Sequence, residues 1–417
     1  MKDFTKLDMF FETLAEYNRF MGSVAVSQNG EIIYTKTVGY ADIEQETKVN
    51  VDTKYRIGSV TKTYTATLVL LAIEEKKLSL NQTIDKFFPN FINANKITIE
   101  HLLYHRSGIP NFTNEDEYQK WYTHPKSEIE LTDFISGLGS EFEPDTEARY
   151  SNSGYVLLTF ILQKVYNKSY NELLQEKICK PLGLKNTYFG AKINIKNNEC
   201  YSYKYQKGWQ KELEEDMSLP QGGGAIVSNP TDIITFVDAL FSGKIISENS
   251  LKQMLTLKDY MGMGIVYMGL MGKHCFGHAG GIDGFCSLYV RHPDNIILAY
   301  TANYLHFYSI NIATTIFKAV LNQQIDIPEF IEYHITEGEL DIYLGEYLCV
   351  EHSLNLIITK VDGLLKGQFT GQSPIPFEAI GKHKFEFVMD GIILEFNTDE
   401  NALTFTQDGA NIIFKKM

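Results

Sequence analysis

The chain has 417 residues, of which 44% are hydrophobic and 22% are charged, and its formal net charge is −14. This length predicts more than one domain, and this composition is that of a folded, soluble protein. The negative charge argues against binding to nucleic acid or to an anionic membrane, and no apolar run reaches the ~18 residues that a membrane span needs.

The first predicted element is an amphipathic helix. Apolar side chains recur at helical spacing at Phe4, Leu7, Phe10, Leu14 and Tyr17, with charged residues between them. We expect this helix to pack on a domain, because the segment lacks the features of a signal peptide. The compartment stays open: the sequence fits a cytoplasmic protein as written, or a periplasmic or extracellular one if a leader has been removed.

The next predicted elements are a hairpin and a helix. Two strand-like runs flank Asn29-Gly30, a dipeptide typical of tight hairpin turns. A helix is predicted from Ser59 to about Lys77, and the residues after it read mainly as loops and short helices. Within "TIEHLLYHRSG" we expect Gly108 to end a helix, since glycine is the commonest residue just past a helix end.

Helices and strands then alternate up to the end of a large domain. A buried helix is predicted to begin near Asn152, and another to run from Pro230, in its first turn, to Gly243. Residues 263–303 carry strand-like runs that glycines interrupt, and "INIATTIFKAVLN" predicts a last helix.

The C-terminal segment has a different pattern. From about Glu337, apolar and polar residues alternate between tight turns. The turns are three Asp-Gly pairs, Asp362-Gly363, Asp390-Gly391 and Asp408-Gly409. Three hairpins in so short a segment predict a small antiparallel sheet or barrel. We therefore predict a large domain at residues 1–325, a linker at 326–337 and a small β-barrel-like domain at 338–417.

Neither the cysteines nor the histidines predict a metal site. The five cysteines are scattered and form no CxxC pair, so we expect buried free thiols rather than a zinc site. His101 and His105 stand four residues apart and could bind a metal from one helix face. However, "HLLYH" lacks the glutamate of the zinc-hydrolase motif and no third ligand is evident, so we expect no metal and no cofactor.

The stretch "IGSVTKTYTATLVL" contains a candidate nucleophile, Ser59, and a candidate base, Lys62. A serine hydroxyl needs an adjacent base, and residues three apart share one helix face. Lysine acts as a base only when neutral, and no carboxylate occurs between Lys54 and Ile73 to hold Lys62 in its charged form. Taken alone, the pair could equally be a serine beside an ordinary surface lysine.

Two later segments add to this pair. In "ARYSNSGYVLL", Tyr150 could relay a proton and Asn152 could bind a substrate amide; the other reading is a tyrosine before an ordinary helix cap. In "FGHAGGIDGF", His278 precedes Gly280 and Gly281, which would let a substrate approach the backbone and offer an N–H group to an oxyanion. The other reading is a glycine-rich turn with an ordinary histidine.

These three segments, in this order, resemble the serine β-lactamase and penicillin-binding-protein family. The similarity is closer to the class C branch, with its related D-aminopeptidases, D-alanyl-D-alanine carboxypeptidases and esterases. Ser-x-x-Lys and Tyr-Ser-Asn match the first two motifs, and His-Ala-Gly stands where Lys-Thr-Gly is usual, a variant familiar in peptidases and esterases. The connecting segments "ITIEHLLYHRSGIPNF" and "LPQGGGAIVSNPTDIITF" are also similar to the family, over about residues 10–325. The tail that "YLGEYL" opens resembles, more weakly, the barrel-like C-terminal domains of some members.

The resemblance implies a role for each motif residue. Ser59 would be the acylated nucleophile and Lys62 would activate it. Tyr150 would pass a proton to the leaving group and later help to activate water, while Asn152 would hold Lys62 and the substrate amide. We leave the base as the Lys62–Tyr150 pair, because two coupled groups share their protons.

The third motif would bind the substrate. His278 would contact the carboxyl end of the substrate or Tyr150, and Gly280 and Gly281 would line the same strand. The backbone N–H groups of Ser59 and Gly281 would form the oxyanion hole.

The resemblance also implies a fold and an activity. We expect an α+β protein, in which an antiparallel sheet built from both chain ends is flanked by helices and a helical lobe, plus the small C-terminal antiparallel β domain. The expected activity is that of a serine hydrolase acting on small amides or esters, such as D-amino-acid peptides. The alternatives are a β-lactamase proper and a catalytically weak penicillin-binding or sensing module. The expected partner is a small molecule or short peptide; the sequence leaves the oligomeric state open.

Overall fold

The computed structural model describes residues 2–205, 208–330, 333–349, 351–352, 354–361, 363–370, 372–407 and 409–417. Two compact units are distinguished by their contacts. One is Phe20–Leu305, and the other joins the segment that ends at Arg19 to the segment that begins at His306. This grouping follows contacts alone, so the domain boundaries at residues 325 and 338 remain a prediction.

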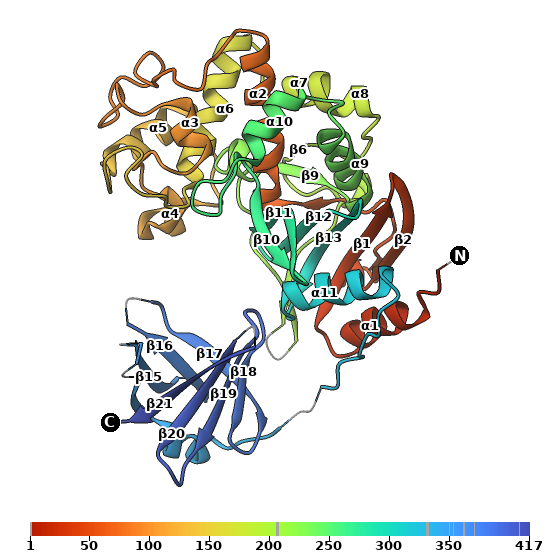
Figure 1. Ribbon diagram of the computed structural model, residues 1–417, viewed down its shortest axis with the longest axis vertical. Coiled ribbons are helices and arrows are strands. Elements are labelled where there is room, and N and C mark those ends of the chain that lie inside the picture. The colour runs from red at the N-terminus through yellow and green to blue at the C-terminus, as the bar shows by residue number, and fades with distance from the viewer. Residues whose placement is uncertain are drawn as a thin grey trace. The chain divides into compact units, whose positions relative to one another are not determined.

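A six-stranded antiparallel sheet forms the base of the larger unit (Figure 1). Its order is β10-β11-β12-β13-β1-β2, so strands from the beginning and the end of this unit pair directly. The bounds are β1 Phe20–Gln28, β2 Glu31–Val38, β10 Val266–Leu270, β11 Lys273–Ile282, β12 Phe285–His292 and β13 Ile296–Leu305. Asn29 and Gly30 both have positive φ, 54° and 82°, in the turn between β1 and β2. The predicted hairpin and the sheet built from both ends are confirmed.

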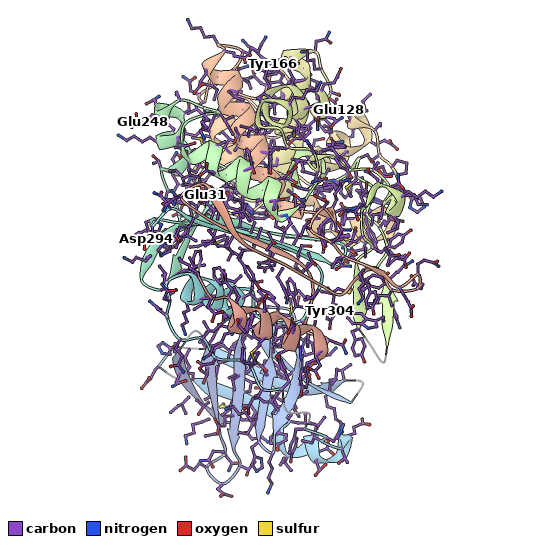
Figure 2. The ribbon with its side chains drawn as sticks, turned by 90° about the vertical axis from the view of Figure 1, so that its right-hand side faces the viewer. Glu31, Glu128, Tyr166, Glu248, Asp294 and Tyr304 are labelled. Atoms are coloured by element: carbon purple, nitrogen blue, oxygen red, sulfur yellow. The ribbon has the colours of Figure 1, made fainter. Side chains whose placement is uncertain are left out.

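The middle part of this unit's sequence forms a lobe of helices, in which Glu128 and Tyr166 are labelled at the top of Figure 2. The helices are α2 Thr61–Glu74, α3 Ile99–Leu103, α4 Asp116–Trp121, α5 Glu128–Gly137, α6 Asn152–Tyr166, α7 Tyr170–Leu174, α8 Lys180–Leu182, α9 Pro230–Phe241 and α10 Glu248–Leu255. Helix α2 is buried on nearly all sides, so its threonines cannot reach water; Thr67 Oγ1 donates to the carbonyl of Thr63 instead. An apolar and hydroxyl-rich sequence therefore forms a central helix rather than a surface one.

Short strands join this lobe to the sheet. The bounds are β3 Tyr40–Asp42, β4 Thr47–Lys48, β5 Tyr55–Arg56, β6 Tyr188–Phe189, β7 Tyr203–Tyr205, β8 Trp209–Lys211 and β9 Ile226–Ser228. Three of them form a small sheet in the order β5-β9-β6, and β5 leads the chain into the 3₁₀ turn Gly58–Val60 and then into α2.

The smaller unit contains two helices and a closed β-barrel. The helices are α1 Thr5–Glu16 and α11 Ser309–Val320. The strands are β14 Gly345–Cys349, β15 Leu354–Val361, β16 Leu364–Phe369, β17 Ile375–Gly381, β18 Lys384–Phe387, β19 Ile392–Asn397, β20 Ala402–Gln407 and β21 Ala410–Lys416, paired in chain order and closed by β14 with β21. The turn at Asp390-Gly391 is as predicted, with Gly391 at φ 63°, whereas Asp362 and Asp408 lie outside the described residues. The predicted C-terminal antiparallel β domain is confirmed.

Two local predictions are wrong. The helix expected to stop at Gly108 is only α3, which ends at Leu103, and His105 already has a left-handed φ of 57°. Gly108 has another reason to be glycine: a Cβ there would lie 2.1 Å from the carbonyl oxygen of Phe142. In α1, Tyr17 is 45% exposed and Phe11 is buried in its place, because the apolar face follows residues 7, 10, 11 and 14.

Two glycines let the turn before α2 lie against strand β11. Gly58 has φ +48°, and a Cβ on it would lie 2.8 Å from the backbone of Gly281. A Cβ on Gly280 would lie 2.1 Å from the carbonyl oxygen of Ile57. Ser287 Oγ on β12 donates to that same carbonyl at 2.7 Å. The turn is therefore fixed to the sheet by backbone contact.

Gly280→Ala is expected to destabilise the protein by about 3 kcal/mol, because the added methyl meets a backbone oxygen that cannot move aside. The measurement is the midpoint of thermal unfolding. Gly281→Ala is the matched control, since the nearest atom to its Cβ is 3.9 Å away and its φ is ordinary. Equal midpoints for the two variants would contradict this account.

Candidate active site

Ser59 lies in the 3₁₀ turn that leads into α2, and two side chains reach its hydroxyl. Lys62 Nζ is 2.9 Å from Ser59 Oγ, and Tyr150 Oη is 2.7 Å from the same oxygen. Lys62 is one helical turn away on α2, whereas Tyr150 comes from the extended residues just before α6. The structure thus brings the first two sequence motifs together around one oxygen atom.

Lys62 is completely buried and has no carboxylate partner among the described residues. Its Nζ lies 2.7 Å from Asn152 Oδ1 and 2.7 Å from the carbonyl oxygen of Gly223. Burial holds the pKa of Lys62 well below its ordinary value. A neutral amine has two N–H groups, which suit the two acceptor oxygens, and a lone pair, which suits the hydroxyl proton of Ser59. An amine held in this way can accept a proton from the hydroxyl.

The hydroxyl of Tyr150 stays protonated and donates a hydrogen bond. Burial raises the pKa of its hydroxyl, so the group keeps its proton at neutral pH. Since the phenol donates to Ser59 Oγ, the serine oxygen can give its own proton to Lys62. Lys62 Nζ also lies 4.8 Å from the centre of the Tyr150 ring, which joins the three groups into one cluster.

His105 supports Tyr150 from behind, a role that sequence reasoning missed. The two rings stack with centroids 4.4 Å apart, and the N–H of Ser151 donates to His105 Nδ1 at 3.1 Å. Burial, reinforced by Lys62 and His278, holds the pKa of His105 well below its ordinary value, so the ring is neutral and its Nδ1 can accept. The similarity of the segment "HLLYHRSG" to the family could have pointed to His105. The four-residue spacing of the two histidines alone suggested only a pair of metal ligands.

The first histidine of that pair has a different use. His101 Nδ1 accepts from the N–H of Thr98 in the capping box of α3. Across the described residues, no group of three or more His, Cys, Asp or Glu side chains could hold a metal ion. The five cysteines are free; four are buried and Cys286 is half-buried.

Asn152 is oriented by its own partners at the first turn of α6. Its N–H donates to Asn111 Oδ1 at 2.9 Å, and its Nδ2 donates to Thr113 Oγ1 at 3.0 Å. The second contact directs Oδ1 toward Lys62. The side-chain amide is therefore fixed in orientation beside the amine.

His278 is buried on β11 and is neutral. Its Nδ1 lies 2.6 Å from the carbonyl oxygen of Ala279, which can only accept, so Nδ1 carries the proton. Burial, together with nearby Lys62, lowers the pKa of His278 to about 4. No hydrogen bond joins His278 to Tyr150 within the described residues, so the structure places it near the cluster without linking the two side chains directly.

A cavity of about 150 Å³ opens beside the nucleophile. Ser59, Asn152 and Gly281 line it, as do Tyr118 and Glu215, which the sequence motifs do not include. Gly280 does not line this cavity; it contacts the backbone at Ile57 instead. The predicted residues Ser59, Lys62, Tyr150 and Asn152 thus form one contact network, while His278 and the two glycines come from the neighbouring strand.

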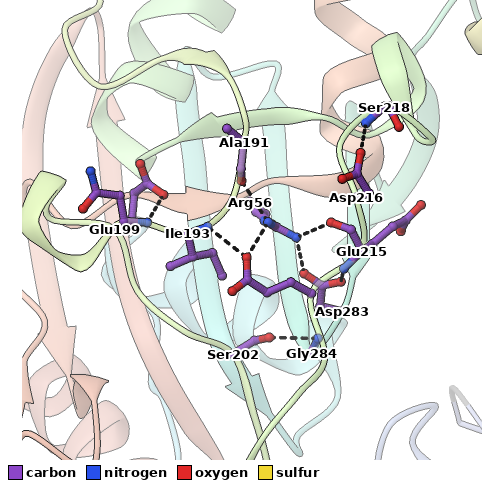
Figure 3. Close-up of polar contacts among 12 residues, drawn as sticks. Arg56, Ala191, Ile193, Glu199, Ser202, Glu215, Asp216, Ser218, Asp283 and Gly284 are labelled. Atoms are coloured by element: carbon purple, nitrogen blue, oxygen red, sulfur yellow. Dashed lines mark hydrogen bonds and ion pairs between the residues drawn. The ribbon is translucent and has the colours of Figure 1, made fainter. Parts of the chain in front are cut away.

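An ion-pair cluster around the buried side chain of Arg56 is drawn in Figure 3. Arg56 Nη1 contacts Asp283 Oδ2 at 2.7 Å, and Nη2 contacts Glu214 Oε2 at 3.0 Å. Arg56 also donates to the backbone carbonyls of Glu215 and Ala191. The cluster therefore fixes the backbone on which Glu215 stands.

No helix among the described residues has the length and apolarity that crossing a bilayer requires. The family model described as "Beta-lactamase" matches residues 7–321. "Penicillin-binding protein 4*" of Bacillus subtilis is 26% identical over 430 residues, which cover 95% of this chain and 94% of that protein.

Two solved structures are similar. D-amino acid amidase from Ochrobactrum anthropi, complexed with D-phenylalanine, has a TM-score of 0.67 and 26% identity, over 76% of this chain and 99% of that one. The octameric penicillin-binding protein homologue from Pyrococcus abyssi has a TM-score of 0.68 over 99% of this chain and 100% of that one; at 23% identity it shows the fold alone.

Asn152→Asp is expected to raise the pKa of Lys62, because it places a carboxylate where an amide oxygen now lies 2.7 Å from Nζ. The measurement is a pH titration of the Nζ resonance in protein labelled with ¹⁵N-lysine. Asn152→Ala is the control, since it removes the acceptor without adding charge and should not move the midpoint upward. A midpoint that stays in place in Asn152→Asp would contradict the expectation that a carboxylate at this position holds Lys62 in its charged form.

Proposed function

This chain belongs to the beta-lactamase family, and from that premise we propose that it hydrolyses small amides or esters through an acyl-enzyme formed on Ser59. Its relatives are serine hydrolases, and so is this chain. The observation that carries the proposal is the pair of contacts on one oxygen: Lys62 Nζ at 2.9 Å and Tyr150 Oη at 2.7 Å from Ser59 Oγ.

Acylation would begin with Lys62. Its neutral amine takes the proton of Ser59 as Oγ attacks the substrate carbonyl carbon. The carbonyl oxygen becomes negative and is stabilised by the backbone N–H groups of Ser59 and Gly281. Tyr150 gives its proton to the leaving nitrogen or oxygen and takes one from the Lys62 ammonium, while the bond to the leaving group breaks. An ester on Ser59 and a free amine or alcohol result.

Deacylation would use the same groups in reverse. Water gives a proton to the Lys62–Tyr150 pair and attacks the ester carbonyl. Ser59 Oγ then leaves and takes the proton back, which releases the acid and restores the starting state. No metal or cofactor takes part in either half of this proposal.

The neutral state of His278 bears on the substrate. A lysine in the third motif would offer a permanent cation to a substrate carboxylate, whereas His278, with a pKa lowered to about 4, offers none at neutral pH. This supports peptidase, amidase or esterase activity on D-amino-acid derivatives over β-lactamase activity. The similarity to an amidase that acts on D-amino acids supports the same choice.

Intact mass spectrometry after incubation with a fluorophosphonate, a p-nitrophenyl ester or a penicillin is expected to show a covalent adduct on the wild type and none on Ser59→Ala. A penicillin adduct that forms and then disappears with turnover would favour the β-lactamase alternative. A stable adduct without turnover of any substrate would favour the sensing module. An adduct that survives Ser59→Ala would contradict the proposal.

His105→Ala is expected to lower kcat about 10- to 100-fold, because Tyr150 loses the ring that holds it in line with Ser59. The KM should change little, since His105 does not line the cavity. The measurement is steady-state kinetics on a p-nitrophenyl ester. His101→Ala is the control on the same segment, and an equal loss in both variants would show that the effect is on folding alone.

A further inference from the structure

Glu215 is the one carboxylate among the described residues that line the cavity beside Ser59, and none of the others is a lysine, arginine or histidine. It lies on the loop before the glycines Gly222–Gly224, far in sequence from all three motifs. The same residue also lines a neighbouring cavity of about 830 Å³. Glu215 therefore lies at the boundary between the small cavity beside Ser59 and the larger cavity.

Among the described residues, the carboxylate of Glu215 forms no direct ion pair. Tyr118 Oη donates to Oε1, and within the described part of the chain no other side chain donates to this carboxylate. Arg56 is nearby, but its side chain pairs with Asp283 and Glu214 and reaches only the backbone of Glu215. In Figure 3 the side chain of Glu215 extends away from Arg56.

In this environment the ionised form of Glu215 is unfavourable unless a cation binds beside it. Burial raises the pKa of the Glu215 carboxyl to about 7. The negative charge of Asp283 adds to the rise, whereas the hydrogen bond from Tyr118 and the more distant charge of Arg56 only partly oppose it. A carboxylate of this kind gains more from an incoming ammonium than an exposed one, because less of its charge is already screened by water. The pocket is therefore suited to a positively charged group.

The position of Glu215 indicates which part of the substrate would carry that charge. In the proposed reaction Tyr150 faces the leaving group, and Tyr150 does not line this cavity. Asn152 and Gly281, which would hold the acyl side, do line it. The cation would therefore belong to the acyl part of the substrate.

We propose that Glu215 binds the free ammonium group of the acyl part, so that this enzyme prefers unblocked amino-acid amides and esters to N-acylated ones. The inference rests on the proposed acyl-enzyme mechanism and adds a specificity residue to it. Glu215 makes no contact with the reacting atoms and acts on binding alone.

The test compares D-alanine p-nitroanilide with N-acetyl-D-alanine p-nitroanilide on the full-length chain. The wild type should cleave the free-amine substrate with a kcat/KM at least ~10-fold higher, and Glu215→Gln should lose that advantage while its rate on the acetylated substrate stays about the same. Glutamine keeps an oxygen for Tyr118, so the fold is preserved. Glu212→Gln is the matched control, since Glu212 lines only the larger cavity.

Three outcomes would overturn the inference and leave the mechanism standing. The wild type could cleave the acetylated substrate at least as well as the free-amine substrate, or Ser59 could be labelled without any cleavage of the free-amine substrate. The third is an equal loss of kcat/KM on both substrates in Glu215→Gln. The wild-type comparison decides the question even if that variant does not fold. If a fluorophosphonate fails to label Ser59 at all, the proposed function itself is wrong and the inference falls with it.

Discussion

The burial of one amine without a counter-ion is the constraint on which the site depends. Lys62 gives its N–H groups to an amide oxygen and a backbone carbonyl, both neutral, so within the described residues no counter-ion stabilises the charged form. A carboxylate in either place would pair with the ammonium and remove the base. Helix α2 fits this constraint, because its other buried positions hold threonines, one tyrosine and aliphatic residues, and its one acid, Glu74, is its last residue.

Close backbone contact fixes the position of the serine beside that amine. Gly58 and Gly280 let the turn that carries Ser59 touch strand β11, so the nucleophile and the third motif are fixed by main chain rather than by flexible side chains. His105 and Asn111 then orient Tyr150 and Asn152 from the other side. Each group that would react is held by a second group that would not, which is how preorganised sites keep their geometry.

The sequence predicted the elements and motifs well where the signal was local. The spacing of Ser59 and Lys62 on one helix face, the Asn29-Gly30 hairpin and the alternation in the tail each depend on neighbours in the chain. The expectation that the sheet joins both ends of the domain came from resemblance to a family, since periodicity alone does not pair β1 with β13. His105 and Glu215 were missed because their roles depend on partners distant in sequence, Tyr150 for one and the pocket at Ser59 for the other.

The pairing of β1 with β13 also governs when the molecule can become active. Phe20 is opposite Leu305 in this ladder, so the sheet closes only when chain segments that far apart meet. Contacts of such long sequence separation form late, since the entropy of closing the loop must be overcome before they contribute. On the ribosome, Ser59 and Lys62 emerge early, yet the strand that carries Gly281 and the neighbour that holds it come near the end of the unit. A growing chain therefore carries its candidate nucleophile without the backbone proposed to assist it, so in that proposal chemistry starts only when the whole unit has been made.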